Sequence, residues 1–221
     1  MSGGPIEAEG GMSFKLLGFP VRLHPSALLI VGLVVLMHIQ GGPEMGLWGA
    51  IYGFVILLSV LVHELGHAVA GRYLGMGPLD ITLHGFGGYT RASRSRGPKR
   101  GLIMTAAGPA AGLVLGVLSY AVYYLYADQA SATVYWTLRR LWEVNLFWSF
   151  FNLLPMVPMD GGLILQQGLK VMGARSAAEI ARWISIVTAI ATGAVAFYVG
   201  QTFLGLFAIY ILSKNVKLNR G

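Results

Sequence analysis

Long runs of apolar residues, separated by short polar stretches, dominate the chain. We expect helices over residues 26–40, 46–73, 101–126, 136–158, 183–199 and 201–213. A membrane-spanning helix needs about 20 mostly apolar residues, so the first run is a short candidate, and the start of the fourth carries Arg139, Arg140 and Glu143. The pattern predicts an all-α protein with about six transmembrane helices, forming a single domain over residues 1–221.

The last two runs form one uncharged stretch from Trp183 to Ser213. As a single helix this stretch would be about 46 Å long, whereas the apolar core of a membrane is about 30 Å thick. It is therefore either one strongly tilted helix or two short helices broken near Gly200 and Gln201.

The distribution of basic residues decides between five and six spans. With six spans and a cytoplasmic N-terminus, only Arg139 and Arg140 of the 16 basic residues lie outside, as the positive-inside rule requires. Five spans would place Lys214, Lys217 and Arg220 outside. We therefore expect six spans, with both termini in the cytoplasm.

Composition supports a multi-pass protein of the cell membrane. Hydrophobic residues make up 55% of the chain and charged residues 11%, whereas soluble domains carry about 25% charged residues. The net charge of +7 then reflects membrane topology and contact with lipid, not binding to nucleic acid. We expect no cleavable signal peptide. The absence of cysteine excludes disulfides and leaves His, Asp and Glu as metal ligands.

Two segments depart from a simple helical pattern. Residues 79–92 (LDITLHGFGGYTRA) place strand-favouring residues on both sides of Gly87 and Gly88, which predicts a short cytoplasmic β-hairpin, with an irregular loop as the alternative. Residues 152–162 (NLLPMVPMDGG) contain two prolines that end a helix. Irregular backbone at membrane depth is tolerated only inside protein or beside a water-filled cavity.

The stretch HELGH, residues 63–67, places three ionisable side chains in an apolar run. Residues four apart share one face of a helix, so His63 and His67 can bind one cation. H-E-x-x-H is the pattern of zinc hydrolases, in which the glutamate, here Glu64, acts as general base. Because ionisable residues within a membrane are costly, three of them in five positions indicate a functional metal site.

A third protein ligand is needed to hold a catalytic zinc ion. The other histidines are His24, His38 and His84, and the carboxylates near membrane depth are Asp160 and Glu143. With six spans, Asp160 and His67 both lie near the cytoplasmic ends of their spans, whereas Glu143 lies near the opposite end. We therefore expect Asp160 to be the third ligand.

Together, HELGHAVAG (residues 63–71) and NLLPMVPMDGG resemble the site-2 protease family of intramembrane zinc metalloproteases. The pattern H-E-x-x-H followed by N-x-x-P-x-x-x-x-D-G is met residue for residue by His63, Glu64, His67, Asn152, Pro155, Asp160 and Gly161. FPVRLHPS (residues 19–26) and AAGPAAG (residues 106–112) are also similar to segments of the family.

The resemblance implies that His63, His67 and Asp160 bind one Zn²⁺ ion and that Glu64 is catalytic. It also implies that Asn152 binds the substrate backbone or the developing oxyanion, and we count Pro155 of the same motif among the substrate-binding residues. The chain resembles the minimal core of the family, without a PDZ domain after the third span or C-terminal CBS domains.

The expected substrate is a transmembrane segment of another membrane protein. Such a segment must unwind before cleavage, and a strand edge can hold it by β-augmentation. The candidates for this edge are Ile81, Leu83, Gly87 and Gly88. A regulatory partner or a homo-oligomer stays open, as do two other functions: a zinc-binding membrane protein without peptidase activity, and a metal-ion transporter.

Overall fold

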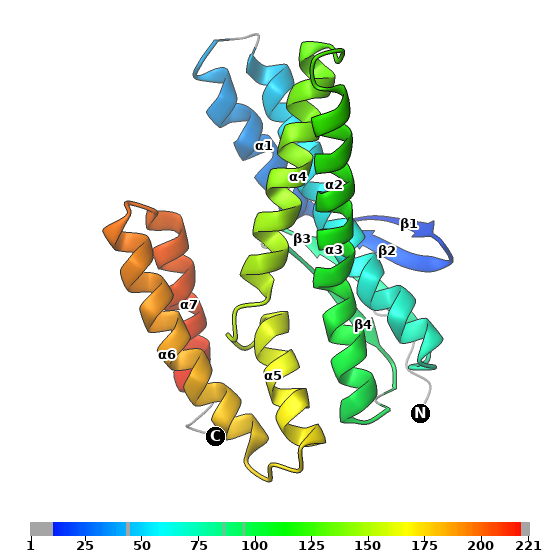
Figure 1. The fold of residues 1–221 in the computed structure, drawn as a ribbon, viewed down its shortest axis with the longest axis vertical. Helices are drawn as coiled ribbons and strands as arrows, with labels where there is room; N and C mark the ends of the chain where they lie inside the picture. The colour runs from blue at the N-terminus through cyan, green and yellow to red at the C-terminus, as the bar shows by residue number, and fades with distance from the viewer. Residues whose placement is uncertain (1–10, 43–44, 86, 95, 218–221) are drawn as a thin grey trace.

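The computed structural model describes residues 11–42, 45–85, 87–94 and 96–217. Figure 1 shows α3 and α4 as a long antiparallel pair beside α2, with a small sheet near the middle of the molecule. The elements are β1 (Met12–Leu16), β2 (Phe19–Leu23), α1 (Pro25–Ile39), α2 (Met45–Tyr73), β3 (Leu79–His84), β4 (Gly87–Ala92), α3 (Pro98–Tyr126), α4 (Ala132–Asn152), α5 (Asp160–Val171), α6 (Ala177–Tyr198) and α7 (Thr202–Lys217).

Helix length and apolar character confirm only part of the predicted membrane topology. Three helices, α2, α3 and α6, are long and apolar enough to cross a membrane, and α1 and α7 are shorter apolar helices. Six spans therefore stay a prediction, whereas a mainly helical fold with a small sheet is confirmed.

The sheet is larger than the predicted hairpin. Its order is β1-β2-β3-β4, with β2 and β3 parallel and the other pairs antiparallel. The hairpin of β3 and β4 was predicted, but that of β1 and β2 was not. The turn between β1 and β2 has positive φ at Leu17 (51°) and Gly18 (82°). Such turns usually carry Asn-Gly or Asp-Gly, so Leu-Gly gave no hairpin signal.

The pairing of β3 corrects the prediction that Ile81 and Leu83 offer a strand edge. Both residues pair with β2 on one side and with β4 on the other, so the backbone of β3 is already used within the sheet. Their side chains are 0% and 3% exposed and pack in a cluster with residues of α2. Among the described strands, the free edge beside Gly87 and Gly88 is that of β4.

Glycines bring three helices close to one another. A Cβ atom on Gly66 of α2 would collide with the backbone of α3 at Ala107, and one on Gly116 of α3 would lie 3.0 Å from Leu146 of α4. Gly108 and Gly112 likewise face His67 and Ser149. Small residues thus allow close helix packing, as the Gly108–Gly112–Gly116 spacing indicates.

The predicted fourth span, residues 136–158, is wrong at its C-terminal end. Helix α4 ends at Asn152, and a non-helical segment, residues 153–159, leads into α5, which was not predicted. Pro155 and Pro158 lack the backbone N–H that a continuing helix requires. The helix break therefore lies immediately before Asp160.

The uncharged run from Trp183 to Ser213 is two helices, α6 and α7, as the second alternative predicted. Gly200 has φ 76°, and the N–H of Gln201 donates to the carbonyl of Ala196 (2.7 Å), which closes the end of α6. Figure 1 shows this helix pair beside α5 and the segment that precedes it, and Phe207 of α7 also packs against Phe151 of α4, with 5.6 Å between the ring centroids.

Candidate metal centre

Helix α2 carries both histidines of the HELGH motif on its buried face. His63 and His67 are 4% and 7% exposed, and their Nε2 atoms lie 3.2 Å apart. The spacing of four residues makes this geometry a direct consequence of helix periodicity. Two imidazole nitrogens that face each other at this distance form half of a metal site.

Asp160, the first residue of α5, completes the group. Its Oδ2 atom lies 2.9 Å from Nε2 of His63, and its Oδ1 atom lies 3.4 Å from Nε2 of His67. In a tetrahedral site the ligand atoms lie about 2.0–2.1 Å from the ion, and hence about 3.3 Å from one another. The three side chains therefore fit one metal ion.

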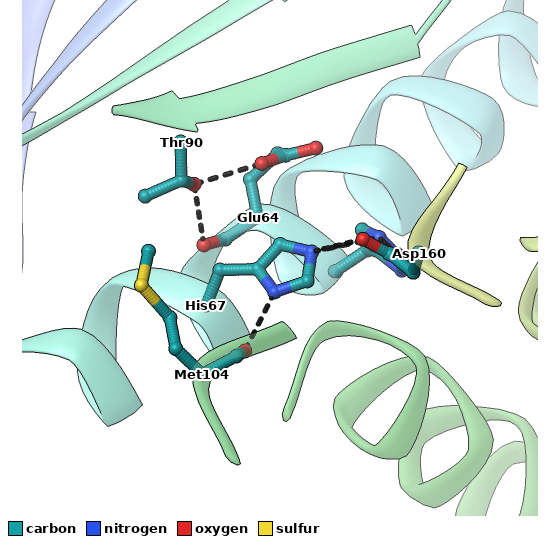
Figure 2. A network of polar contacts seen from close by, with 6 residues as sticks. Glu64, His67, Thr90, Met104 and Asp160 are labelled. Carbon is teal, nitrogen blue, oxygen red and sulfur yellow. Dashed lines mark hydrogen bonds and ion pairs between the residues drawn. The ribbon is translucent and has the colours of Figure 1, made fainter. Parts of the chain in front are cut away.

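A backbone carbonyl sets the orientation of His67. Its Nδ1 atom lies 2.9 Å from the carbonyl oxygen of Met104, and its ring points from there toward Asp160 (Figure 2). Because a carbonyl only accepts, Nδ1 carries the proton and Nε2 keeps its lone pair for a cation. Gly108 of α3 lies against the same ring.

Glu64 lies beside the ligand group and is held by strand β4. The hydroxyl of Thr90 lies 2.7 Å from the carboxylate Oε2 of Glu64 and 3.0 Å from its backbone carbonyl (Figure 2). A Cβ atom on Gly88 would lie 2.6 Å from Cγ of Glu64. The edge strand therefore passes directly over this carboxylate.

A cavity of about 240 Å³ joins these groups. Besides the ligands, Glu64 and Thr90, its lining includes Gly87, Gly88, Asn152, Pro158 and Met159. Of the residues predicted to bind substrate, the structure places Asn152, Gly87 and Gly88 in this lining. Pro155 is not part of it. Residues of β4 and the three candidate ligands thus line the same cavity.

The matches to known proteins agree with this geometry. A model of peptidase family M50 matches residues 51–139, which include the HELGH helix. Rip3 of Mycobacterium tuberculosis is 32% identical over 217 residues, 89% of this chain and 54% of Rip3. Zinc metalloprotease MJ0392 of Methanocaldococcus jannaschii is 30% identical over 154 residues, 69% of this chain and 43% of that protein.

The chain is thus similar to peptidase family M50 over residues 51–139 and to two proteins named as zinc metalloproteases. The chain spans about half the length of these relatives. It shares its fold with the site-2 protease from Methanocaldococcus jannaschii, with a TM-score of 0.69, 24% identity and 94% of each chain covered. Its apolar helices and its similarity to this family indicate a membrane protein.

The other histidines considered as ligands have different surroundings. His24 Nδ1 lies 2.7 Å from the hydroxyl of Ser26, and His38 Nδ1 lies 2.8 Å from the carbonyl of Val34. Burial, together with the nearby His24, lowers the pKa of His84 below its usual value. Each of these histidines lies outside the ligand group formed among the described residues.

Glu143 is also excluded as a ligand by its partners. It forms ion pairs with Arg139 (2.9 Å) and Arg140 (2.7 Å) on the same helix. Arg139 and Arg140 are the two basic residues that the predicted topology places on the outer side of the membrane. Their ion pairs with Glu143 stabilise α4.

Sequence reasoning missed three contributors to the site: Thr90, Met104 and Gly108. Met104 acts through its backbone carbonyl, which leaves no mark in the residue type. Thr90 follows Gly88 by two positions on a predicted strand, so the alternation of strand faces placed both residues on one side.

Proposed function

We propose that this chain is an intramembrane zinc metalloprotease that hydrolyses peptide bonds in transmembrane segments of other membrane proteins. The observation that carries the proposal is the convergence of His63, His67 and Asp160, with Glu64 beside them in one cavity. The relationship to zinc metalloprotease MJ0392 supports zinc as the metal and peptides as the substrate class.

The residues of the site divide the chemistry among them. A zinc ion held by His63, His67 and Asp160 would supply Lewis acidity and lower the pKa of water. Glu64 takes a proton from the attacking water and delivers it to the leaving amine. The side-chain amide of Asn152 donates to the oxyanion that develops on the attacked carbonyl. Thr90 keeps the carboxylate of Glu64 aimed into the cavity.

The substrate segment would bind along β4. The free edge of this strand borders the cavity of the ligand group, so an added strand would bring its peptide bonds to Glu64. A second cavity, of about 410 Å³, is lined mainly by apolar residues of α1, α2, α4 and α7. It also reaches Gly87 of β4, and we propose that it accommodates the apolar side chains of the substrate.

Site-specific photo-cross-linking tests this placement. Tyr89 on β4 and Phe14 on β1 are exposed aromatic residues on opposite edge strands of one sheet, 43% and 44% exposed. A photoreactive residue at position 89 is expected to capture a transmembrane substrate, whereas one at position 14 is not. Equal capture at both positions would remove the proposed role of β4.

We also propose six spans, formed by α1, α2, α3, α4, α6 and α7, with both termini in the cytoplasm. Basic-residue asymmetry supports this topology, although its count includes Arg220, which lies outside the described residues. Accessibility labelling of single cysteines is informative because the chain has none of its own. A cysteine at position 129, between α3 and α4, is expected to react from the outside and one at position 174 from the cytoplasm.

Metal analysis combined with proteolysis tests the function. The full chain is purified, its zinc content is measured, and cleavage of transmembrane substrates is compared with that by Glu64→Gln. The proposal expects one zinc ion in both proteins and cleavage only by the wild type. Bound zinc without cleavage by the wild type would favour a non-peptidase zinc protein, and metal transport into proteoliposomes would favour a transporter.

A further inference from the structure

The segment before Asp160 is hydrogen-bonded to the helix pair α6/α7 through the backbone of one residue, Val157. The N–H of Val157 donates to the hydroxyl of Ser185 on α6 (2.9 Å), and its carbonyl accepts from Nδ2 of Asn215 on α7 (2.7 Å). Two helices thus satisfy both backbone groups of a single residue. We call Ser185 and Asn215 the Val157 clamp.

The clamp residues are the most deeply buried polar side chains of their helices. Ser185 is 0% and Asn215 1% exposed. The second amide hydrogen of Asn215 donates to the carbonyl of Ile211 (2.9 Å), so two carbonyl acceptors fix the orientation of the amide. Burying polar groups is costly, and Oδ1 of Asn215 has no hydrogen-bond partner among the described residues. Neither clamp residue belongs to the chemistry proposed above.

Apolar packing reinforces the same attachment. Met156 and Met159 of the segment form a buried cluster with Ala189 of α6 and Ile211 of α7. These contacts attach the segment to the same two helices as the clamp does.

Rigid backbone contacts connect Val157 with Asp160. The first turn of α5 contains Gly161 and Gly162, both buried. A Cβ atom on Gly162 would collide with the backbone N of Val157, and one on Gly161 would collide with the backbone of Leu153. The segment therefore lies directly on the turn that carries Asp160, with no flexible side chain between them.

We propose that Ser185 and Asn215 are positioning residues for the metal ligand Asp160, through Val157. This inference rests on the proposed metal site. It adds that the affinity for the metal ion depends on α6 and α7, which contribute no ligand. Outer groups that orient a ligand typically change metal affinity about 10–100-fold when they are removed. A clamp that served stability alone would leave metal affinity unchanged.

Zinc affinity of clamp variants tests the inference. Zinc transfer from the purified full chain to a chromophoric chelator is measured for wild type, Ser185→Ala and Asn215→Leu. The matched control is Ser119→Ala, because Ser119 is also buried in an apolar helix but donates only to its own helix at Leu115 (2.7 Å). Both clamp variants are expected to bind zinc about 10–100-fold more weakly, the control is expected to match the wild type, and Ser185→Thr is expected to restore affinity.

Hydrogen exchange of the wild type provides a test that requires no variant. Coupling between two sites is reciprocal, so added zinc is expected to slow exchange of the Val157 amide. Folded clamp variants with wild-type zinc affinity, or exchange at Val157 that zinc leaves unchanged, would overturn the inference. These results differ from failure of the proposed function, in which the wild type itself would bind no zinc at His63, His67 and Asp160.

Discussion

His63 and His67 reach the metal centre on a regular helix, whereas Asp160 reaches it at the end of a segment without regular structure. The two histidines need only the periodicity of α2 to face one point. Asp160 depends on residues 153–159, on the glycines of α5 and on contacts from α6 and α7. One half of the site is therefore encoded locally, and the other half is assembled by tertiary contacts.

This difference shows which side of the metal site can be altered by substituting residues that are not ligands. The α2 side is enclosed by α3 and by the sheet, so its geometry changes only if the core moves. The Asp160 side is attached to the helix pair α6/α7, which lies at one side of the molecule (Figure 1). Substitutions far from the ion can therefore change the Asp160 side first.

The largest expected effect is loss of a ligand from either side. His67→Ala and Asp160→Ala leave two protein ligands in place of three, so both are expected to lose stoichiometric zinc and all measurable proteolysis. Glu64→Gln is the control, because it removes the base and leaves the ligands in place. Zinc content by elemental analysis checks this, and full zinc content in Asp160→Ala would contradict the assignment of the third ligand.

The second-largest effect is expected from Asn152, the last residue of α4, where the regular helix meets the irregular segment. Asn152→Ala removes the amide donor proposed for the oxyanion. Loss of one such donor lowers kcat about 100–1000-fold in other hydrolases, and the same loss is expected here with zinc content unchanged. Steady-state kinetics measure it, and a rise in KM at constant kcat would instead assign Asn152 to ground-state binding.

The two sides also differ in how far the sequence predicts them. The HELGH pattern indicates both histidines, Glu64 and their shared face, because helix periodicity is a local property. The helix break before Asp160 is foreseen from its prolines, but α5 is not, since a helix of twelve residues with glycines in its first turn gives a weak local signal. The contacts of Val157 with α6 and α7 join residues far apart in sequence and leave no local pattern.

A smaller effect is expected from filling the space beside His67. A Cβ atom on Gly108 would collide with the imidazole ring, so Gly108→Ala is expected to displace the ring and weaken zinc binding about 10–100-fold. Gly32→Ala on α1 is the matched control, because the added Cβ atom would meet no atom of another element within 4 Å. Chelator competition measures both, and equal zinc affinities would show that the α2 side tolerates more movement than its packing indicates.

The smallest expected effect concerns the hydrogen bond of Thr90 to Glu64. Thr90→Val keeps the side-chain shape and removes the hydroxyl donor, which leaves the carboxylate less well oriented. A hydrogen bond to a charged group contributes about 1.5–3 kcal/mol, and the lower end of this range gives an expected loss of about tenfold in kcat, without loss of zinc. Single-turnover kinetics with Thr90→Ser as the conservative variant provide the check, and wild-type rates in Thr90→Val would exclude a role in orienting Glu64.

X-ray absorption at the zinc edge tests the central claim most directly. For the wild type we expect one zinc ion with two imidazole nitrogens and a carboxylate oxygen at about 2.0–2.2 Å, and for Asp160→Asn a clear loss of the oxygen contribution or of zinc itself. A first shell without imidazole scattering, or a spectrum that Asp160→Asn leaves unchanged, would contradict a metal centre built from His63, His67 and Asp160.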